Sequence, residues 1–130
     1  MNMQTYRTYH AENIEAQVAN ASPVELVRML MARLLEEMAR ARAHIVARRY
    51  EAKGRSIIKC IDILTGLSSA LDYEKGGEAA IGMARLYQGC ILRLNEAGIT
   101  LAVEPLDEVA TFIGELDASW SDAMVANGGA

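Results

Sequence analysis

Apolar residues recur at helical spacing in four long segments of this chain. In the first, residues 23–49, Leu26, Leu30, Leu34 and Met38 stand four positions apart. Such spacing places apolar side chains on one face of an α-helix. Similar stripes predict helices from residue 51 or 55 to 70, over 78–98, and from 105 to about 125. Four amphipathic helices with short connections predict an all-α, antiparallel four-helix bundle.

The predicted core is formed by the apolar stripes of these helices. We expect it to contain Leu26, Leu30, Leu34, Ile61, Leu64, Leu94, Leu116 and Trp120. Ile81 also falls on the inner stripe predicted for the third helix.

Helix boundaries are marked by capping residues and glycines. Ser22 is a good N-cap, Pro23 suits the first helical position, and Glu25 completes a capping box. The adjacent Gly76 and Gly77 predict the end of one helical segment, with Glu78 in the first turn of the next helix. Gly98 is expected to end that helix as its C′ residue, and Pro105 to open the last one.

The chain is predicted to have one domain with two extensions. Residues 22–125 form the bundle, residues 1–21 an N-terminal segment, and residues 126–130 a frayed C-terminus. Ile14 and Val18 in the N-terminal segment share one helical face. So short a helix does not hold alone in water, so this segment has either to dock as a short helix or to stay mobile.

Composition excludes several classes of protein. Hydrophobic residues make up 52% of the 130 residues but aromatic residues only 5%, a mixture that favours helix over sheet. The net charge is −4 without a dense basic stripe, so nucleic acid is not expected as a partner. The absence of a signal peptide and of a long apolar run predicts a cytoplasmic protein with no membrane insertion. Cys60 and Cys90 are interpreted as small buried hydrophobic residues rather than as a disulfide.

The chain shows no catalytic, cofactor-binding or metal-binding motif. There is no HExxH sequence, no cysteine–histidine cluster and no glycine-rich phosphate loop, so we expect no metal site, no cofactor and no enzyme. Glu36 and Glu37 are interpreted as a solvated face rather than an acid–base pair. His44 lies near several arginines that can hold a phosphate, which leaves histidine phosphotransfer as an alternative to an ordinary surface histidine.

Several short motifs resemble the bacterial flagellar secretion chaperone family FliS. The opening Tyr6-x-x-Tyr9 and Ala21-Ser22-Pro23-x-Glu25-Leu26 are similar to the YxxY and ASPxEL motifs of that family. The centre is similar to its LDxEKGGE motif, read here from Leu71 to Glu78 and followed by Leu86-Tyr87. Residues 116–120 are similar to the motif near the C-terminal end of that family. One departure is the sequence Met31-Ala32-Arg33, where the family has tyrosine, aspartate and glycine.

The resemblance implies a binding function rather than catalysis. Members of the family bind the disordered C-terminal segment of flagellin in the cytoplasm, prevent its premature polymerisation and deliver it to the type III flagellar export gate. A helical adaptor or dimerisation module in signalling, including a homodimer, is the alternative that the residues leave open. The loop from Asp72 to Glu78 either sets the crossing of two helices or contacts a partner.

Candidate flagellin-binding residues come from two parts of the chain. In the N-terminal segment the resemblance implies that three residues cover or share a groove: Tyr6, Tyr9 and Ile14. On the bundle, positions that flank the apolar stripes are expected to line the groove. These are Met31, Leu35, Ile58, Met83, Tyr87 and Ile91.

Overall fold

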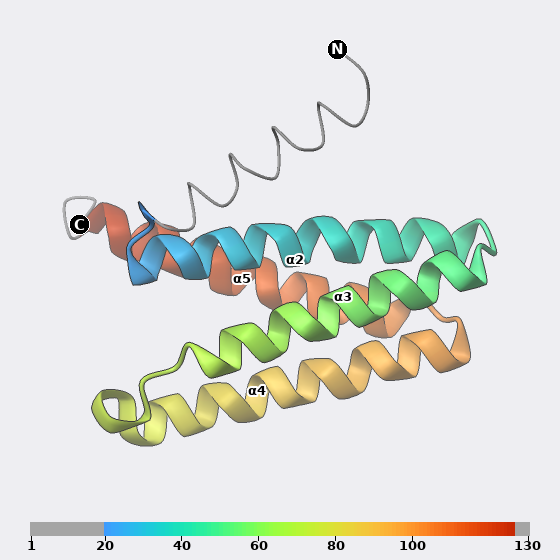
Figure 1. Cartoon of the computed structure of the whole chain (residues 1–130). Helices are drawn as coiled ribbons and strands as arrows, with labels where there is room; N and C mark the ends of the chain where they lie inside the picture. The colour runs from blue at the N-terminus through green and yellow to red at the C-terminus, as the bar shows by residue number, and fades with distance from the viewer. Residues whose placement is uncertain (1–19, 127–130) are drawn as a thin grey trace, which may run out of the picture.

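The protein is a bundle of four long α-helices (Figure 1). The computed structural model describes the chain from residue 20 to residue 126, and its side chains to residue 119. The helices are α2 (Pro23–Val46), α3 (Tyr50–Ser69), α4 (Tyr73–Thr100) and α5 (Glu104–Ala126). Successive helices run in opposite directions in Figure 1, and α2 and α4 each pack against both α3 and α5. The predicted all-α bundle is therefore confirmed.

The core runs between the four helices and matches the predicted stripes in part. Leu34, Leu64 and Leu94 are fully buried, as expected. Three other predicted core residues, Leu30, Ile61 and Leu116, are half-buried and pack against it. Leu26 is also half-buried but does not pack against this core. Trp120 has its side chain outside the described part. The prediction for Ile81 was wrong, because this side chain is 38% exposed and the buried face of α4 is formed by Ala80, Tyr87, Cys90, Leu94 and Ala97 instead.

The start of α2 is the predicted capping box. Glu25 N donates to Ser22 Oγ at 3.2 Å, and Ser22 N donates to Glu25 Oε2 at 3.3 Å. Two amide donors that the first helical turn leaves unpaired are thereby satisfied. The helix ends at Val46 rather than at residue 49, because Arg48 has a left-handed backbone with φ of 59°.

The glycine pair interrupts the helix within the bounds of α4, as predicted. α3 ends at Ser69, and Asp72 caps α4 by accepting a hydrogen bond from Lys75 N at 3.0 Å. The carboxylate of Asp72 thus starts a helical turn before the glycines, which was not predicted. Gly77 then has a non-helical backbone, with φ of 51° and ψ of −127°, and separates this first turn from the long helix that follows. The predicted break at the glycines, with Glu78 in the first turn of the next helix, is therefore confirmed.

The end of α4 also differs from the prediction. The helix continues through Gly98 to Thr100, and Leu101, not Gly98, adopts the left-handed cap with φ of 59°. The Gly98 carbonyl oxygen accepts a hydrogen bond from Lys53 Nζ at 2.8 Å, which ties the start of α3 to the end of α4. α5 begins at Glu104, one residue before the predicted Pro105. In the described residues, no helix is long and apolar enough to cross a membrane.

Candidate binding recess

An apolar recess opens at the end of the bundle where α2 begins. It has a volume of about 480 Å³ and lies among the start of α2, the end of α3 and the start of α4. In Figure 1, α3 and α4 run obliquely to α2 and separate from it toward this end. We call this hollow the three-helix recess. Its lining residues are Pro23, Val24, Val27, Leu67, Ala70, Leu71, Asp72, Lys75, Gly76, Ala79, Ala80, Met83 and Tyr87.

The three-helix recess has a buried apolar floor and a charged rim. Leu67, Ala80 and Tyr87 are 2%, 6% and 3% exposed and form the floor. Burial, and secondarily the neighbouring Cys90, raises the pKa of the Tyr87 hydroxyl, so this tyrosine stays neutral. The rim carries Asp72 and Lys75, both exposed. Such a floor binds apolar side chains, and the rim leaves one charge of each sign at its edge.

The kink at Gly77 shapes one wall of the three-helix recess. A Cβ atom placed on Gly76 would lie 2.8 Å from the Cβ of Ala80, closer than side-chain atoms approach one another. The glycine pair therefore permits the first turn of α4 to fold against the helix that follows it. The segment from Asp72 to Glu78 thus includes the cap and the first turn of α4 and contributes Asp72, Lys75 and Gly76 to the lining of the recess.

A second recess, between α4 and α5, has a volume of about 470 Å³. Its apolar lining includes Leu86, Leu92 and Phe112. The guanidinium of Arg93 at its edge is held by the carboxylates of Glu96 and Glu108. A partner entering this α4–α5 recess has to accommodate an ion-paired edge, whereas the rim charges of the three-helix recess form no ion pair within the described residues.

A polar cleft of about 220 Å³ between α2 and α3 corrects the interpretation of Glu36 and Glu37. Glu36 is exposed, but Glu37 is only 6% exposed and accepts a hydrogen bond from Arg40 Nη1 at 2.7 Å. Burial acts to raise the pKa of Glu37, but hydrogen bonds from Ser56 and Arg40 and nearby positive charges outweigh it, and the pKa is lowered. Position 37 faces α3, so it is not part of a solvated face.

The cysteines and His44 have ordinary environments. Cys60 and Cys90 are free and buried, as predicted. Burial, followed by the charge of Glu37, raises the pKa of Cys60 to about 12, so its thiol is unreactive at neutral pH. His44 Nδ1 accepts a hydrogen bond from Arg49 Nε at 3.0 Å. Among the residues whose side chains are described, no group of three or more His, Cys, Asp or Glu can hold a metal ion.

The predicted binding residues are distributed over several parts of the molecule. Met83 and Tyr87 lie in the three-helix recess. Met31 is fully buried, Leu35 and Ile91 are half-buried against the core, and Ile58 is 60% exposed outside both recesses. The N-terminal candidates lie outside the described residues: Tyr6, Tyr9 and Ile14.

Sequence reasoning did not single out several residues of the recess. Val24, Val27 and Ala79 line it, although they were not among the candidates. Periodicity contained only part of the necessary signal. Val27 directly follows Leu26 of the first apolar stripe, but periodicity gives no information about where two helices separate and leave the edge of a stripe uncovered.

Comparisons with known proteins agree with the resemblance found in the motifs. The family model described as flagellar protein FliS matches residues 4–127. The chain is 40% identical over 118 residues to the flagellar secretion chaperone FliSB of Pseudomonas aeruginosa, covering 91% of this chain and 94% of that protein. It is 32% identical over 115 residues to the flagellar secretion chaperone FliS of Salmonella typhimurium, covering 88% and 85%. It is 29% identical over 114 residues to that of Vibrio cholerae, covering 88% and 84%. The chain therefore belongs to the FliS family of flagellar secretion chaperones.

Proposed function

We propose that this protein binds the C-terminal segment of flagellin in the cytoplasm, prevents its premature polymerisation and delivers it to the flagellar type III export gate. The observation that carries the proposal is the three-helix recess, which is open, predominantly apolar and close to 480 Å³ in volume. Relatives named as flagellar secretion chaperones support the choice of client. The proposed role is stoichiometric binding without catalysis.

The shape of the recess suits an amphipathic helix. A helix binds in a groove by inserting apolar side chains spaced three or four residues apart. Buried residues at the floor, such as Leu67 and Tyr87, provide the complementary apolar surface. A disordered segment that folds on binding typically buries about 1,000–3,000 Å², and its ordering costs about 2–5 kcal/mol. This area exceeds what a single recess offers, so we expect the client to extend beyond it.

Substitutions on α4 test where flagellin binds. Ala79→Glu places a carboxylate in the three-helix recess at an exposed position, so the bundle should fold normally. We expect it to weaken binding of a flagellin C-terminal peptide at least about tenfold, because a charge would be buried against apolar side chains. The matched control is Ile99→Glu, which adds the same charge to an 82% exposed position of α4 outside both recesses.

Titration calorimetry and far-ultraviolet circular dichroism give the readout. The proposal requires a stoichiometric complex with a gain of helix, and Ala79→Glu must weaken it more than Ile99→Glu does. Equal affinity of the two variants would place the client elsewhere on the bundle. The α4–α5 recess is then examined with Leu86→Glu, which changes a half-exposed residue of that lining.

The N-terminal segment is proposed to share the client site. Tyr6, Tyr9 and Ile14 provide amphipathic surface that suits a groove which must open. Deletion of residues 1–18 should leave the bundle folded and change the affinity for flagellin. Unchanged affinity in calorimetry would show that this segment has no part in binding. If no flagellin binds and the protein self-associates strongly in size-exclusion chromatography, the adaptor or dimerisation alternative is favoured instead.

A further inference from the structure

Positive charge is concentrated around the turn that joins α2 to α3. Residues 40–59 contain seven lysines and arginines but a single acidic residue, Glu51, although the whole chain carries −4. The turn lies at the end of the bundle opposite the three-helix recess, since it follows the last residue of α2. Charges separated by more than about 8 Å are largely screened at physiological salt. A partner at the turn therefore experiences the local positive charge rather than the net negative charge.

Several of these cations already have partners within the fold. Arg40 pairs with Glu37, and Arg42 pairs with Asp107 through Nε at 2.9 Å. Lys53 donates to the Gly98 carbonyl. The remaining arginines are at or beside the turn: Arg48, Arg49 and Arg55. Arg55 has only a 3.6 Å pair with Glu51, which is 94% exposed, so this pair contributes little.

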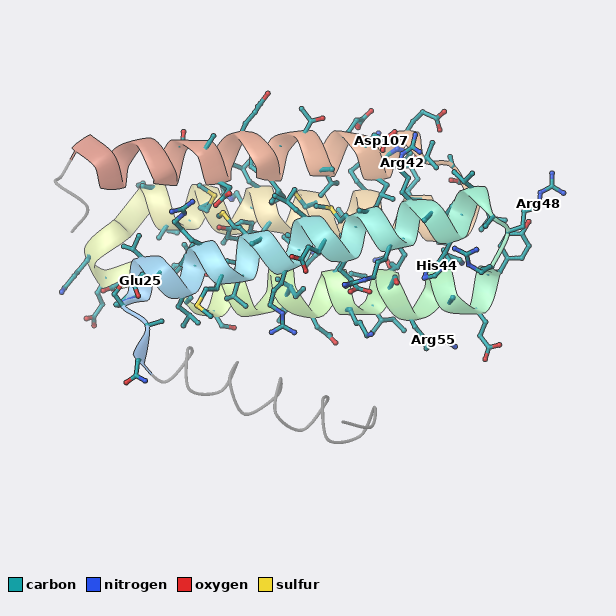
Figure 2. All side chains as sticks on the ribbon, turned by 90° about the horizontal axis from the view of Figure 1, so that it is seen from above. Glu25, Arg42, His44, Arg48, Arg55 and Asp107 are labelled. Atoms are coloured by element: carbon teal, nitrogen blue, oxygen red, sulfur yellow. The ribbon has the colours of Figure 1, made fainter. Side chains whose placement is uncertain are left out.

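Arg48 occupies a position at which its own backbone is strained. Its φ of 59° is the left-handed conformation that glycine adopts without steric cost at the end of a helix. For other L-residues this conformation costs about 1–2 kcal/mol. No hydrogen bond or ion pair of the Arg48 side chain is found within the described residues, and Figure 2 shows it projecting away from the end of the bundle. Two backbone hydrogen bonds, from Arg48 N to the Ile45 carbonyl and from Arg49 N to the His44 carbonyl, offset this cost as in a Schellman helix end. The turn thereby holds the Arg48 side chain out in solvent, where it can contact a partner.

Arg49 beside it is oriented by a histidine. Arg49 Nε donates to His44 Nδ1 at 3.0 Å, which leaves the two terminal amino groups of the guanidinium for another acceptor. A guanidinium held in this way is suited to a carboxylate, because it offers two parallel N–H donors. Val46, 65% exposed, and Tyr50, 48% exposed, flank the two arginines. We call Val46, Arg48, Arg49, Tyr50 and Arg55 the α2–α3 turn surface.

We propose that the α2–α3 turn surface docks an acidic segment of a partner protein. The start of α5, beside the turn at the same end of the bundle, favours a narrow peptide partner over a bilayer or a nucleic acid. α5 begins there with the exposed Glu104, which forms no ion pair within the described residues, while Asp107 and Glu108 pair with Arg42 and Arg93. Figure 2 shows Asp107 at the same end of the bundle as Arg48. A flat anionic surface would meet both the turn and the start of α5, find no unpaired cation at the second and be repelled by Glu104. A single peptide segment can contact the basic turn alone. This site goes beyond the proposed client recess.

Binding of the full-length protein to a synthetic Glu-rich peptide tests the proposal, with a Lys-rich peptide of equal length as a reference. Fluorescence anisotropy should show binding of the Glu-rich peptide only, weakening from low ionic strength to about 0.15 M. Arg48→Glu should weaken it about tenfold, because an attractive charge becomes repulsive. The matched control, Arg33→Glu, makes the same charge change at an exposed position of α2 and should alter binding less than about twofold.

A second pair of variants separates strain from charge. Arg48→Gly removes the side chain and relieves the backbone, so thermal stability should stay equal or rise while peptide binding weakens. Leu101→Gly relieves the equivalent left-handed residue at the α4–α5 connection and should raise stability without affecting the peptide. The proposal is overturned if Arg48→Glu and Arg33→Glu act equally, if Arg48→Gly binds the peptide as the unsubstituted protein does, or if phosphatidylglycerol vesicles bind more tightly than the peptide.

Discussion

The pair α2–α5 and the pair α3–α4 are stabilised by different means. α2 and α5 are joined by the ion pairs Arg28–Asp117 and Arg42–Asp107. No ion pair joins α3 to α4 in the described structure. The described residues include eight glycines. Seven of them lie in α3 and α4, and one, Gly114, lies in α5. Glycine in a helix interior costs about 0.5–1 kcal/mol relative to alanine, so the α3–α4 pair has the lower intrinsic helix stability.

Exposed apolar surface follows the same division. Seven large hydrophobic residues of α3 and α4 are exposed: Tyr50, Ile58, Tyr73, Ile81, Leu86, Leu92 and Ile99. Within the same helical boundaries, α2 exposes only Val46, at its last position, and the described side chains of α5 include none. Most of the three-helix recess is also lined by α3 and α4. The comparison indicates that α2–α5 provides a firm support and that α3–α4 provides most of the exposed apolar surface, which is where the proposed client would bind.

The largest effect is expected at the kink of α4. Gly77→Ala forces an L-residue into φ of 51° and ψ of −127°, a conformation that costs about 1–3 kcal/mol. Chemical denaturation should show a loss of stability of that size, and flagellin binding should weaken because the recess wall moves. A variant as stable as the unsubstituted protein would mean that the kink relaxes freely.

The next effect concerns Glu37, which joins the two pairs across the α2–α3 interface. Its pKa is lowered in the fold, so its contribution to stability is present above the ordinary glutamate pKa of about 4.3 and is lost as pH falls through the lowered value. Glu37→Gln should reduce stability at pH 7 by about 1–3 kcal/mol and make the acid-induced loss shallower. The more exposed Glu36→Gln is the control. Parallel pH curves for Glu37→Gln and the unsubstituted protein would contradict this prediction.

A smaller effect, in the opposite direction, is expected at Gly66 of α3. A Cβ there meets no atom within 4 Å, so Gly66→Ala should stabilise the protein by about 0.5–1 kcal/mol. Hydrogen exchange should slow in α3 more than in α2, which would support the lower stability of the α3–α4 pair. Equal slowing throughout the bundle would instead show that the four helices open as one unit.

The smallest effect is expected for the exposed ion pair between α2 and α5. The side chains of Arg42 and Asp107 are 49% and 47% exposed, and exposed pairs of this kind contribute little to stability because water and salt screen them. Arg42→Gln should therefore lower the melting temperature slightly, with a difference that shrinks at high salt. A large loss that salt does not reduce would show that α5 depends on this pair more than on its buried residues Val109 and Ile113.

Local chemistry in the sequence was sufficient for the helix type, the first cap and much of the core. Leu34, Leu64 and Leu94 each lie on the apolar stripe of their own helix, and helical geometry alone turns such a stripe toward the core. The capping box at Ser22 and Glu25 needs only residues three positions apart. The family motifs likewise required no coordinates. These features were predicted correctly because each depends on interactions within one helix.

Tertiary structure decided the features that depend on how helices meet. The burial of Glu37 depends on α3 lying against it, which the pattern of α2 alone does not reveal. The three-helix recess exists because α3 and α4 separate from α2 at one end, which no periodicity within a single helix encodes. A stripe of apolar residues determines which face of a helix avoids water, but only packing determines whether another helix covers that face or leaves it for a partner.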